Sequence, residues 1–311
     1  MKNLSIIIPT YNSENSLNEL TNRLYVVLES LTDSYEIIFI NDSSTDNTPQ
    51  ILDSLSNSNP NISQIELNRN FGQHNAILCG IRKAKYDTIV TLDDDLQNPP
   101  EEIPKLIRKY NEGFDVVYGY PQKDKHSFFR IISSLITKIA LKTTMGVGIA
   151  KHVSSFRIFK TNLKESFADY KGTFVSIDVL LSWGTNSFSA IPVNHEKRSD
   201  GKSNYTVRKL INHALNMITG FSVLPLQIAS IMGFVLALFG LLVLIYVVFR
   251  FLLQGSPVPG FPFIASIIAI FSGAQLLAIG IIGEYLARIH FRTMNKPQYF
   301  IRQKPNNFPK N

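Results

Sequence analysis

Short apolar runs alternate with longer amphipathic segments over the first 120 residues of the chain. Runs rich in Ile, Val and Phe predict buried strands, and apolar residues at helical spacing predict helices. The predicted strands are Leu4–Ile8, Tyr35–Ile40, Ile62–Leu67, Tyr86–Leu92 and Asp115–Tyr118. The predicted helices between them are Ser16–Ser30, Thr45–Leu55, His74–Lys83 and Glu101–Tyr110. This alternation predicts an α/β domain with a mostly parallel, doubly wound sheet.

The C-terminal third of the chain carries two apolar segments of a different kind. Ile228–Leu253 contains one charged residue, Arg250, and Phe261–Ile282 contains none. At a rise of about 1.5 Å per residue, each segment is long enough to cross the ~30 Å hydrocarbon core of a bilayer. The sequence therefore predicts two transmembrane helices, with a buried hairpin of a soluble protein as the alternative.

The charges around these segments predict their orientation. Gln254–Gly260, between the segments, is uncharged, whereas basic residues flank the pair on both outer sides: Arg208 and Lys209 before it, and Arg288, Arg292 and Lys296 after it. By the positive-inside rule, both outer flanks lie in the cytoplasm. We therefore expect a multi-pass protein of the inner (cytoplasmic) membrane with the α/β domain and both termini in the cytoplasm.

This organisation divides the chain into four predicted parts. They are a cytoplasmic α/β domain over residues 1–206, a juxtamembrane amphipathic helix over 207–227, a two-helix membrane hairpin over 228–290 and a cytoplasmic tail over 291–311. Phe128–Lys142 and Val207–Ile218 mix apolar and basic residues, which is typical of interfacial helices and equally of packed core helices. A single cysteine, Cys79, allows no internal disulfide and suits a reducing compartment.

Charge is divided unevenly along the chain. Residues 1–120 carry 9 basic and 17 acidic side chains, residues 121–213 carry 15 and 6, and residues 214–311 carry 7 and 1. A basic surface often binds nucleic acid, but beside apolar segments an anionic or phosphorylated lipid is the better match. We therefore expect the lipid bilayer, and no nucleic acid, among the partners.

Candidate chemistry follows the predicted strands, because ligands of doubly wound sheets bind outside the carboxyl ends of the strands. The first strand leads into Pro9-Thr10-Tyr11-Asn12, which lacks the glycines of a dinucleotide-binding turn and argues against a dehydrogenase. After the second strand, the carboxylate of Asp42 is suited to accept hydrogen bonds from a base or a ribose. Its neighbours Ser44, Thr45 and Asp46 are equally suited to cap the next helix.

Three acids, Asp93, Asp94 and Asp95, follow the fourth strand. A D-x-D pair arises by chance about once in a chain of this length, so its position carries the information. Three carboxylates at the end of a buried strand repel one another unless a cation or hydrogen-bond donors compensate them. A hard divalent cation bound there would neutralise a diphosphate.

With these residues the chain resembles the family 2 glycosyltransferases of GT-A fold. Within them it resembles the polyprenyl-phosphate glycosyltransferases, such as dolichol-phosphate mannose synthase and bactoprenol glucosyltransferase. The matching motifs are IIIPTYN at 6–12, INDSSTDNT at 40–48, LNRNFGQHNA at 67–76, DDDLQNPPEEIP at 93–104, SFRIF at 155–159, KRSDGKSNY at 197–205 and IGEYLARI at 282–289.

The resemblance implies roles for the matching residues. The nucleotide-sugar would be bound by Pro9, Tyr11, Asn12, Glu14, Asp42, Asp93 and Asp94. A divalent metal, Mg²⁺ or Mn²⁺, would be held by Asp93, Asp95 and Gln97. The acceptor phosphate would be bound by Arg157, Arg198, Lys202 and Ser203, and Asp95 and the two arginines would be catalytic. Arg69 and Asn70 also match a motif, with a structural role in a turn as the alternative.

Three positions depart from the family pattern. The first motif usually continues Asn-Glu, but here Ser13 separates Asn12 from Glu14. Ser155 stands where Asp or Gly commonly precedes the Phe-Arg pair, and Asn204 stands where the later motif usually has lysine. These departures leave open whether Glu14 contacts the nucleotide and whether Lys202 replaces the missing lysine.

The implied reaction is inverting transfer of a hexose or related sugar from a nucleotide-sugar to polyprenyl (undecaprenyl) phosphate, for cell-envelope glycan or glycolipid modification. A phosphate with a second pKa of about 6 is largely dianionic at neutral pH, so this acceptor needs no strong base. Transfer to a hydroxyl of a lipid-linked glycan is the alternative, and it would need a base such as Asp178 or Glu196.

Two other interpretations fit less well. A processive polysaccharide synthase of this family would carry a Gln-x-x-Arg-Trp motif, whereas the only tryptophan, Trp183, lies in Leu-Ser-Trp-Gly. A degenerate binding or scaffolding protein would not need the intact acids at 93–95. The sugar, the nucleotide and any homo-oligomer stay open.

Overall fold

The computed structural model describes residues 3–122, 152–172, 174–196, 224–254 and 260–303. The chain forms two compact units: Met1–Ile211 together with Asn295–Asn311, and Asn212–Met294. The predicted interfacial segments Phe128–Lys142 and Val207–Ile218 lie outside the described residues, as do Arg198, Lys202 and Ser203.

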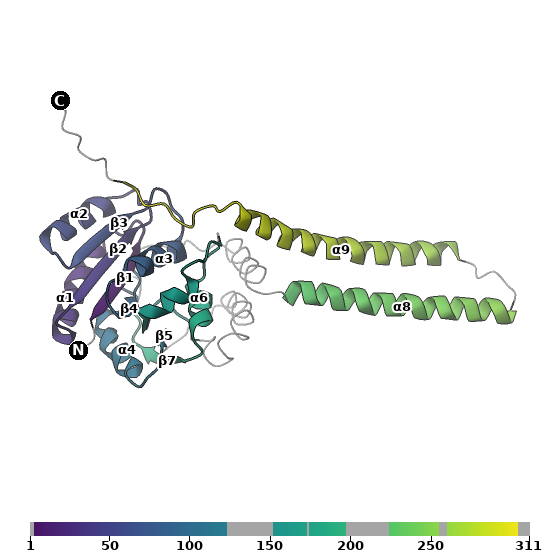
Figure 1. Ribbon diagram of the computed structural model, residues 1–311, viewed down its shortest axis with the longest axis horizontal. Coiled ribbons are helices and arrows are strands. Elements are labelled where there is room, and N and C mark those ends of the chain that lie inside the picture. The colour runs from purple at the N-terminus through teal and green to yellow at the C-terminus, as the bar shows by residue number, and fades with distance from the viewer. Residues whose placement is uncertain (1–2, 123–151, 173, 197–223, 255–259, 304–311) are drawn as a thin grey trace, which may run out of the picture. The chain divides into compact units, whose positions relative to one another are not determined.

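Within its described residues, the first unit is built on one seven-stranded sheet, shown in Figure 1. Its first four strands, β1 (Leu4–Thr10), β2 (Tyr35–Asn41), β3 (Ile62–Glu66) and β4 (Thr88–Thr91), pair in parallel and confirm the predicted strands. The helices between them also match the prediction within a few residues: α1 (Leu17–Leu31), α2 (Thr48–Ser58) and α3 (Gln73–Lys83). After β4 come η1 (Pro100–Glu102), α4 (Ile103–Tyr110) and β5 (Val116–Pro121).

The remaining strands extend the sheet beyond β4. The strand order is β3-β2-β1-β4-β6-β5-β7, where β6 (Arg157–Lys160) runs antiparallel to β4 and β5, and β7 (Phe188–Val193) runs parallel to β5. Between β6 and β7 lie η3 (Thr161–Phe167) and α6 (Ile177–Gly184). The order reverses between β1 and β4, so the loops after these two strands flank a topological switch point, where ligands of such sheets bind.

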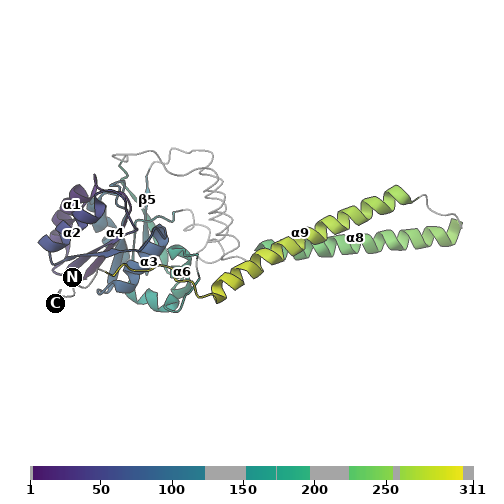
Figure 2. The same cartoon turned by 90° about the horizontal axis from the view of Figure 1, so that it is seen from above.

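Helices cover both faces of the sheet. Side chains of α1, α2 and α4 join the strands in one buried apolar cluster, while α3 packs on the opposite face of β1 and β2 and also contacts α6 (Figure 2). The approach of α3 is close: a Cβ at Gly80 would lie 2.5 Å from a methyl of Ile7 and 2.8 Å from Ile40. Glycine is therefore required at this position to seat α3.

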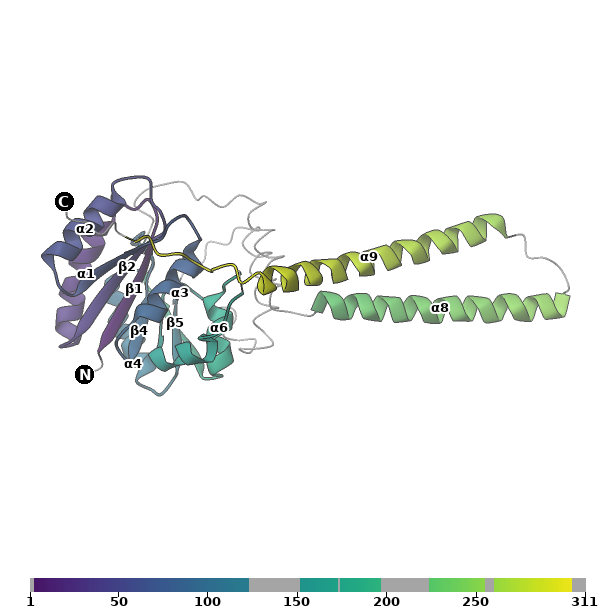
Figure 3. The ribbon, with the colours of Figure 1, turned by 45° about the horizontal axis from the view of Figure 1, so that its top comes forward.

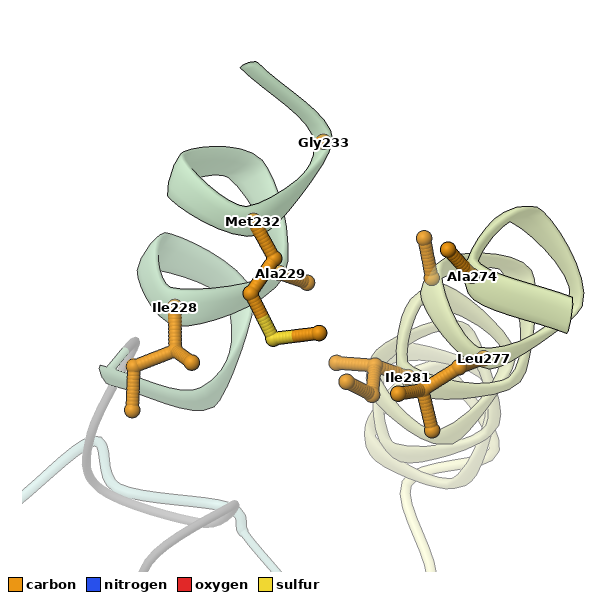
Figure 4. A pocket seen from close by; sticks show the side chains of 8 residues that line it. Ile228, Ala229, Met232, Gly233, Ala274, Leu277 and Ile281 are labelled. Atoms are coloured by element: carbon orange, nitrogen blue, oxygen red, sulfur yellow. The ribbon is translucent and has the colours of Figure 1, made fainter. Parts of the chain in front are cut away.

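The second unit contains α8 (Leu224–Gln254) and α9 (Phe261–Thr293). Both are long and apolar enough to cross a membrane, and their large side chains are exposed, as Phe234 (71%) and Leu276 (69%) illustrate. Near the start of α8 the two helices flank an open apolar pocket of about 210 Å³ (Figure 4), lined by Ile228, Ala229, Met232, Gly233, Ala274, Leu277, Ala278 and Ile281.

Candidate active site

Three loops at the carboxyl ends of β1, β2 and β4 form the candidate site. Each contains a non-glycine residue with a positive φ: Asn12 (54°), Ser43 (61°) and Leu96 (60°). Such backbone is uncommon for serine and leucine, although asparagine adopts it more readily, and it tends to occur at functional sites. Leu96 is buried in the core, so its side chain fixes the acidic loop to the fold.

The loop after β1 is fastened to the loop after β2. Asn12 Oδ1 accepts a hydrogen bond from the backbone N–H of Thr45 at 2.8 Å, and the Asn12 N–H donates to Ser44 Oγ at 3.0 Å. Glu14 Oε2 accepts from the Asn47 N–H at 3.0 Å. Two of the predicted nucleotide residues, Asn12 and Glu14, thus hold these two loops together, while the neighbouring residue Tyr11 is 46% exposed.

Asp42, at the end of β2, is buried and bridges to the loop before α3. Its two carboxylate oxygens accept hydrogen bonds from the backbone N–H groups of Phe71 and Gly72, each at 2.7 Å. Burial raises the pKa of Asp42, and these two hydrogen bonds oppose the rise. Gly72 has a φ of +92°, a conformation that favours glycine. Asp42 therefore holds the loop before α3 against the end of β2.

The acidic loop after β4 brings Asp93, Asp94 and Asp95 beside the other two loops. Asp93 accepts a hydrogen bond from Gln73 Nε2 at 2.6 Å and another from the Ser155 hydroxyl. Asp95 accepts from the Gln97 N–H at 3.2 Å.

Asp94 is held by the loop after β1. Its carboxylate accepts hydrogen bonds from the Ser13 hydroxyl and from the Tyr11 N–H at 3.2 Å. Desolvation raises the pKa of Asp94 to about 6; the charges of Asp93 and Asp95 add to the rise, and the two hydrogen bonds oppose it. The carboxylates of this loop therefore lie close together in a partly desolvated place, where a bound cation would stabilise their charged forms.

Sequence reasoning missed three of these partners: Gln73, Ser13 and Ser155. The signal was present, since Ser13 and Ser155 are two of the three positions that depart from the family pattern. In the folded chain, the Ser13 hydroxyl donates a hydrogen bond to Asp94, and the Ser155 hydroxyl donates one to Asp93. We therefore interpret Ser13 and Ser155 as parts of the site.

The donor chemistry of the acidic loop fits a hard divalent cation. Asp93 and Asp95 offer carboxylate oxygens and Gln97 an amide oxygen, the ligand types that Mg²⁺ and Mn²⁺ prefer. Among the described residues, no three His, Cys, Asp or Glu side chains converge on one point. These residues would therefore hold a metal together with oxygens of a bound diphosphate, in the way magnesium sites commonly use substrate phosphates.

Arg157, predicted at the phosphates, lies in the core of this structure. Its side chain is 1% exposed, forms an ion pair with Asp178, and donates from Nε to Thr91 Oγ1 at 3.1 Å. The Tyr118 hydroxyl donates to the same Asp178 carboxylate at 3.1 Å, and burial holds the pKa of Tyr118 well above its usual value. This buried cluster supports Thr91, the last residue of β4, directly under the acidic loop.

The segment after β7 is tied to the acidic loop. The Glu196 N–H donates to the Gln97 carbonyl at 2.9 Å, and Arg23 of α1 contacts Glu196 at 3.1 Å and Glu101 at 2.8 Å. Arg198, Lys202 and Ser203 follow this segment and lie outside the described residues. Both carboxylates that a hydroxyl acceptor would recruit as a base, Asp178 and Glu196, are engaged by arginines.

Solved structures are similar to this chain in fold. Glucosyl-3-phosphoglycerate synthase from Mycobacterium tuberculosis, in complex with Mn²⁺, UDP and phosphoglyceric acid, is 15% identical over 70% of this chain and 76% of that chain, with a TM-score of 0.52. Its complex with UDP is 14% identical over 70% and 80% of the two chains, with a TM-score of 0.51. S. aureus TarS 1–349 in complex with UDP-GlcNAc is 19% identical over 72% and 74%, with a TM-score of 0.47.

The family of this chain is assigned from its sequence, because solved structures at this level of identity show the fold alone. Residues 5–171, more than half of the chain, match the family described as Glycosyl transferase family 2. This range covers β1 to β6 and all three loops of the candidate site. The chain belongs to glycosyl transferase family 2 and is a GT-A glycosyltransferase that takes its sugar from a nucleotide-sugar.

Proposed function

We propose that this enzyme transfers a hexose or related sugar, with inversion, from a nucleotide-sugar to polyprenyl phosphate at the cytoplasmic face of a membrane. One observation carries the proposal: the same chain joins a family 2 site to two helices that are long and apolar enough to cross a bilayer. An enzyme with that construction is suited to an acceptor that is itself held in the bilayer. The excess of basic side chains in residues 121–213 supports an anionic acceptor headgroup.

The donor is assigned to the three loops. Pro9, Tyr11, Asn12, Glu14 and Asp42 line the nucleotide, and Asp93 and Asp94 face its ribose and diphosphate. Asp93, Asp95 and Gln97 would hold Mg²⁺ or Mn²⁺, which would neutralise the charge of the diphosphate leaving group. The complex of the mycobacterial synthase with Mn²⁺ and UDP makes UDP-sugars and Mn²⁺ the first pair to test.

The acceptor phosphate supplies the nucleophile. One of its anionic oxygens attacks the anomeric carbon while the bond from that carbon to the diphosphate oxygen breaks, and no proton has to be removed. Arg198 and Lys202 screen the repulsion between the two anionic reactants, and Ser203 donates a hydrogen bond to the acceptor phosphate. Arg157, which is buried and paired with Asp178, acts by supporting β4 and the acidic loop.

The test is transfer of radiolabelled sugar from a panel of nucleotide-sugars to undecaprenyl phosphate, with purified enzyme in detergent. We expect label in the lipid extract with one donor, and a severe loss of lipid-phosphate use in Arg198→Ala with a partial loss in Arg198→Lys. Lysine reproduces a bidentate arginine contact poorly. Label that appears only with a lipid-linked glycan acceptor, or normal kinetics in Arg198→Ala, would contradict the proposal.

The proposed topology has its own test. A cysteine at Ser256 should react with an impermeant thiol reagent added outside intact cells, and one at Asn311 should not. The native Cys79 is a silent background because it is fully buried and its pKa is raised to about 11, chiefly by desolvation. The reverse labelling pattern would place the catalytic unit outside.

A further inference from the structure

The segment after α9 returns to the sheet of the catalytic unit. The Asn68 N–H donates to the Phe300 carbonyl at 2.8 Å, and the Arg302 N–H donates to the Glu66 carbonyl at 2.7 Å. These bonds pair Leu67 with Ile301 in antiparallel fashion, just beyond the end of β3. The Arg302 guanidinium also forms an ion pair with the Glu66 carboxylate. Figures 1 and 3 show this segment as the yellow trace that follows α9.

A second set of contacts fixes the same segment on the α3 side. Gln298, which is 8% exposed, donates from Nε2 to the Tyr170 carbonyl at 2.8 Å and to the Gly172 carbonyl at 3.0 Å. The Arg82 guanidinium of α3 lies 5.6 Å from the centre of the Tyr299 ring. Residues 298–302, here called the C-terminal brace, are therefore held by backbone, side-chain and cation–π contacts.

The loop that the brace contacts is the one that holds two acids of the donor site. Five residues separate Leu67, paired with the brace, from Gln73, which donates to Asp93. Between them, the N–H groups of Phe71 and Gly72 donate to Asp42, and Arg69 lies over the Phe71 ring at 4.6 Å. The brace thus fixes one end of a short loop whose other end positions Asp42 and Asp93.

We propose that the C-terminal brace positions the donor site: its residues Phe300 and Arg302 order the 67–73 loop, and through it the carboxylates of Asp42 and Asp93. For its effect on catalysis the inference rests on the proposed donor site. The brace begins four residues after Met294, the last residue of the helical unit, so the chain that leaves the second membrane-length helix also holds one end of the 67–73 loop. The loss of the brace should therefore act on donor binding before it acts on acceptor use.

The other reading of the brace is a cover for the sheet edge, which would contribute to stability alone. The two readings differ in where the effect appears. A mere edge cover lowers the melting temperature and leaves the Phe71 and Gly72 amides as well protected as the rest of the folded unit. A positioning brace changes these two amides locally, together with the Michaelis constant for the donor.

The test uses full-length Arg302→Pro, which removes the guanidinium and the N–H that donates to Glu66, beside Arg302→Ala, which keeps the N–H. Chains that end at Pro297 or at Gln303 form a second pair, with and without the brace. Hydrogen exchange at Phe71 and Gly72, nucleotide affinity and melting temperature are measured on these four proteins, on Gln298→Ala and on the control. Thr185→Ala, which loses a 2.6 Å hydrogen bond to Asp115 near β7, is the control for general destabilisation.

We expect Arg302→Pro and the chain ending at Pro297 to speed exchange at both amides about tenfold, the effect of losing hydrogen bonds at one end of the loop. Their donor KM should rise several-fold at nearly constant kcat, while the chain ending at Gln303 and Thr185→Ala leave both quantities unchanged. Gln298→Ala should give a smaller change in the same direction, and it carries the test if Arg302→Pro does not fold.

Unchanged exchange at Phe71 and Gly72 in folded protein without the brace would overturn the inference. The exchange measurement needs no substrate, so its outcome is separate from that of the proposed function. Absence of transfer to polyprenyl phosphate by the wild type would remove the proposed acceptor and leave the brace standing.

Discussion

Asp94 and Asp178 are carboxylates of the same unit with different partners. Asp94 accepts from the Ser13 hydroxyl and the Tyr11 backbone, and desolvation together with the charges of its two acidic neighbours raises its pKa to about 6. Asp178 is paired with the Arg157 guanidinium in the core. Neutral hydrogen-bond donors do not compensate the negative charge of the acidic loop, so a cation can do so. The ion pair with Arg157, by contrast, compensates the charge of Asp178. The first arrangement suits a metal and diphosphate site, and the second holds the fold.

Glu101 and Glu196 give a third case at the surface. Both are half-exposed and share the guanidinium of Arg23, whose own side chain is 22% exposed. Water screens such pairs, so they contribute little to stability even where their geometry is good. Substitutions in the acidic loop, at the buried ion pair and at the surface ion pairs should therefore have effects of decreasing size. The first should change the rate of transfer, and the other two the free energy of unfolding.

The largest effect is expected in the acidic loop. Asp95→Asn keeps the shape of the side chain but removes the charge that would hold the metal, so transfer should fall by about 10³-fold or more. The melting temperature should change little, because Asp95 is partly exposed. Excess EDTA should abolish transfer by the wild type, and Mn²⁺ or Mg²⁺ should restore it. Full turnover in excess EDTA would contradict the assignment of a metal to this site.

The next largest effect belongs to the buried pair. Arg157→Met leaves the Asp178 carboxylate in the core without its ion-pair partner, which should lower the free energy of unfolding by about 3–5 kcal/mol. The double variant Arg157→Met/Asp178→Leu should recover most of this loss. The measurement is denaturant unfolding of both proteins. A single variant as stable as the wild type but inactive would mean that Arg157 contacts a substrate.

The contrast between these clusters also explains what could be predicted from sequence. The β1 to β4 strands and their helices follow local apolar patterns, so their bounds were predicted within a few residues. The four-residue β6 opens on an arginine that reads as a surface or phosphate-binding side chain, because only the fold supplies Asp178 as its partner. The brace escaped prediction for the same reason, since nothing local links residue 301 to residue 67.

A smaller effect is expected for the hydroxyls that hold the acids. Ser13→Ala and Ser155→Ala each remove one hydrogen bond from a hydroxyl to a carboxylate, that of Asp94 and that of Asp93 respectively. Each should weaken donor affinity by about tenfold or somewhat more, because a hydrogen bond to a charged group contributes roughly 1.5–3 kcal/mol. Titration of nucleotide-sugar into the purified variants measures this. Ser30→Ala, which loses a hydroxyl bond to the Val27 carbonyl inside α1, is the matched control and should bind normally. Normal binding by both site variants would make the two serines incidental.

The smallest effect is expected for Arg23. Its contacts join α1 to Glu101 and Glu196, but they lie at the surface, so Arg23→Ala should lower the free energy of unfolding by only about 0.5–1 kcal/mol. Because the Debye length falls from ~10 Å at 0.1 M salt to ~3 Å at 1 M, the difference from the wild type should shrink as salt rises.

A double-mutant cycle between Arg23→Ala and Glu196→Gln isolates the contact that anchors the segment leading to Arg198. Its coupling energy should exceed that of the cycle with Glu19→Gln, because Arg23 lies 3.1 Å from Glu196 and 3.5 Å from Glu19. Both cycles are measured by denaturant unfolding at low and high salt. A coupling energy between Arg23 and Glu196 that does not change with salt would mean that this pair is shielded from water, as the buried Arg157 pair is. Glu196 would then not be a surface carboxylate of the kind described above.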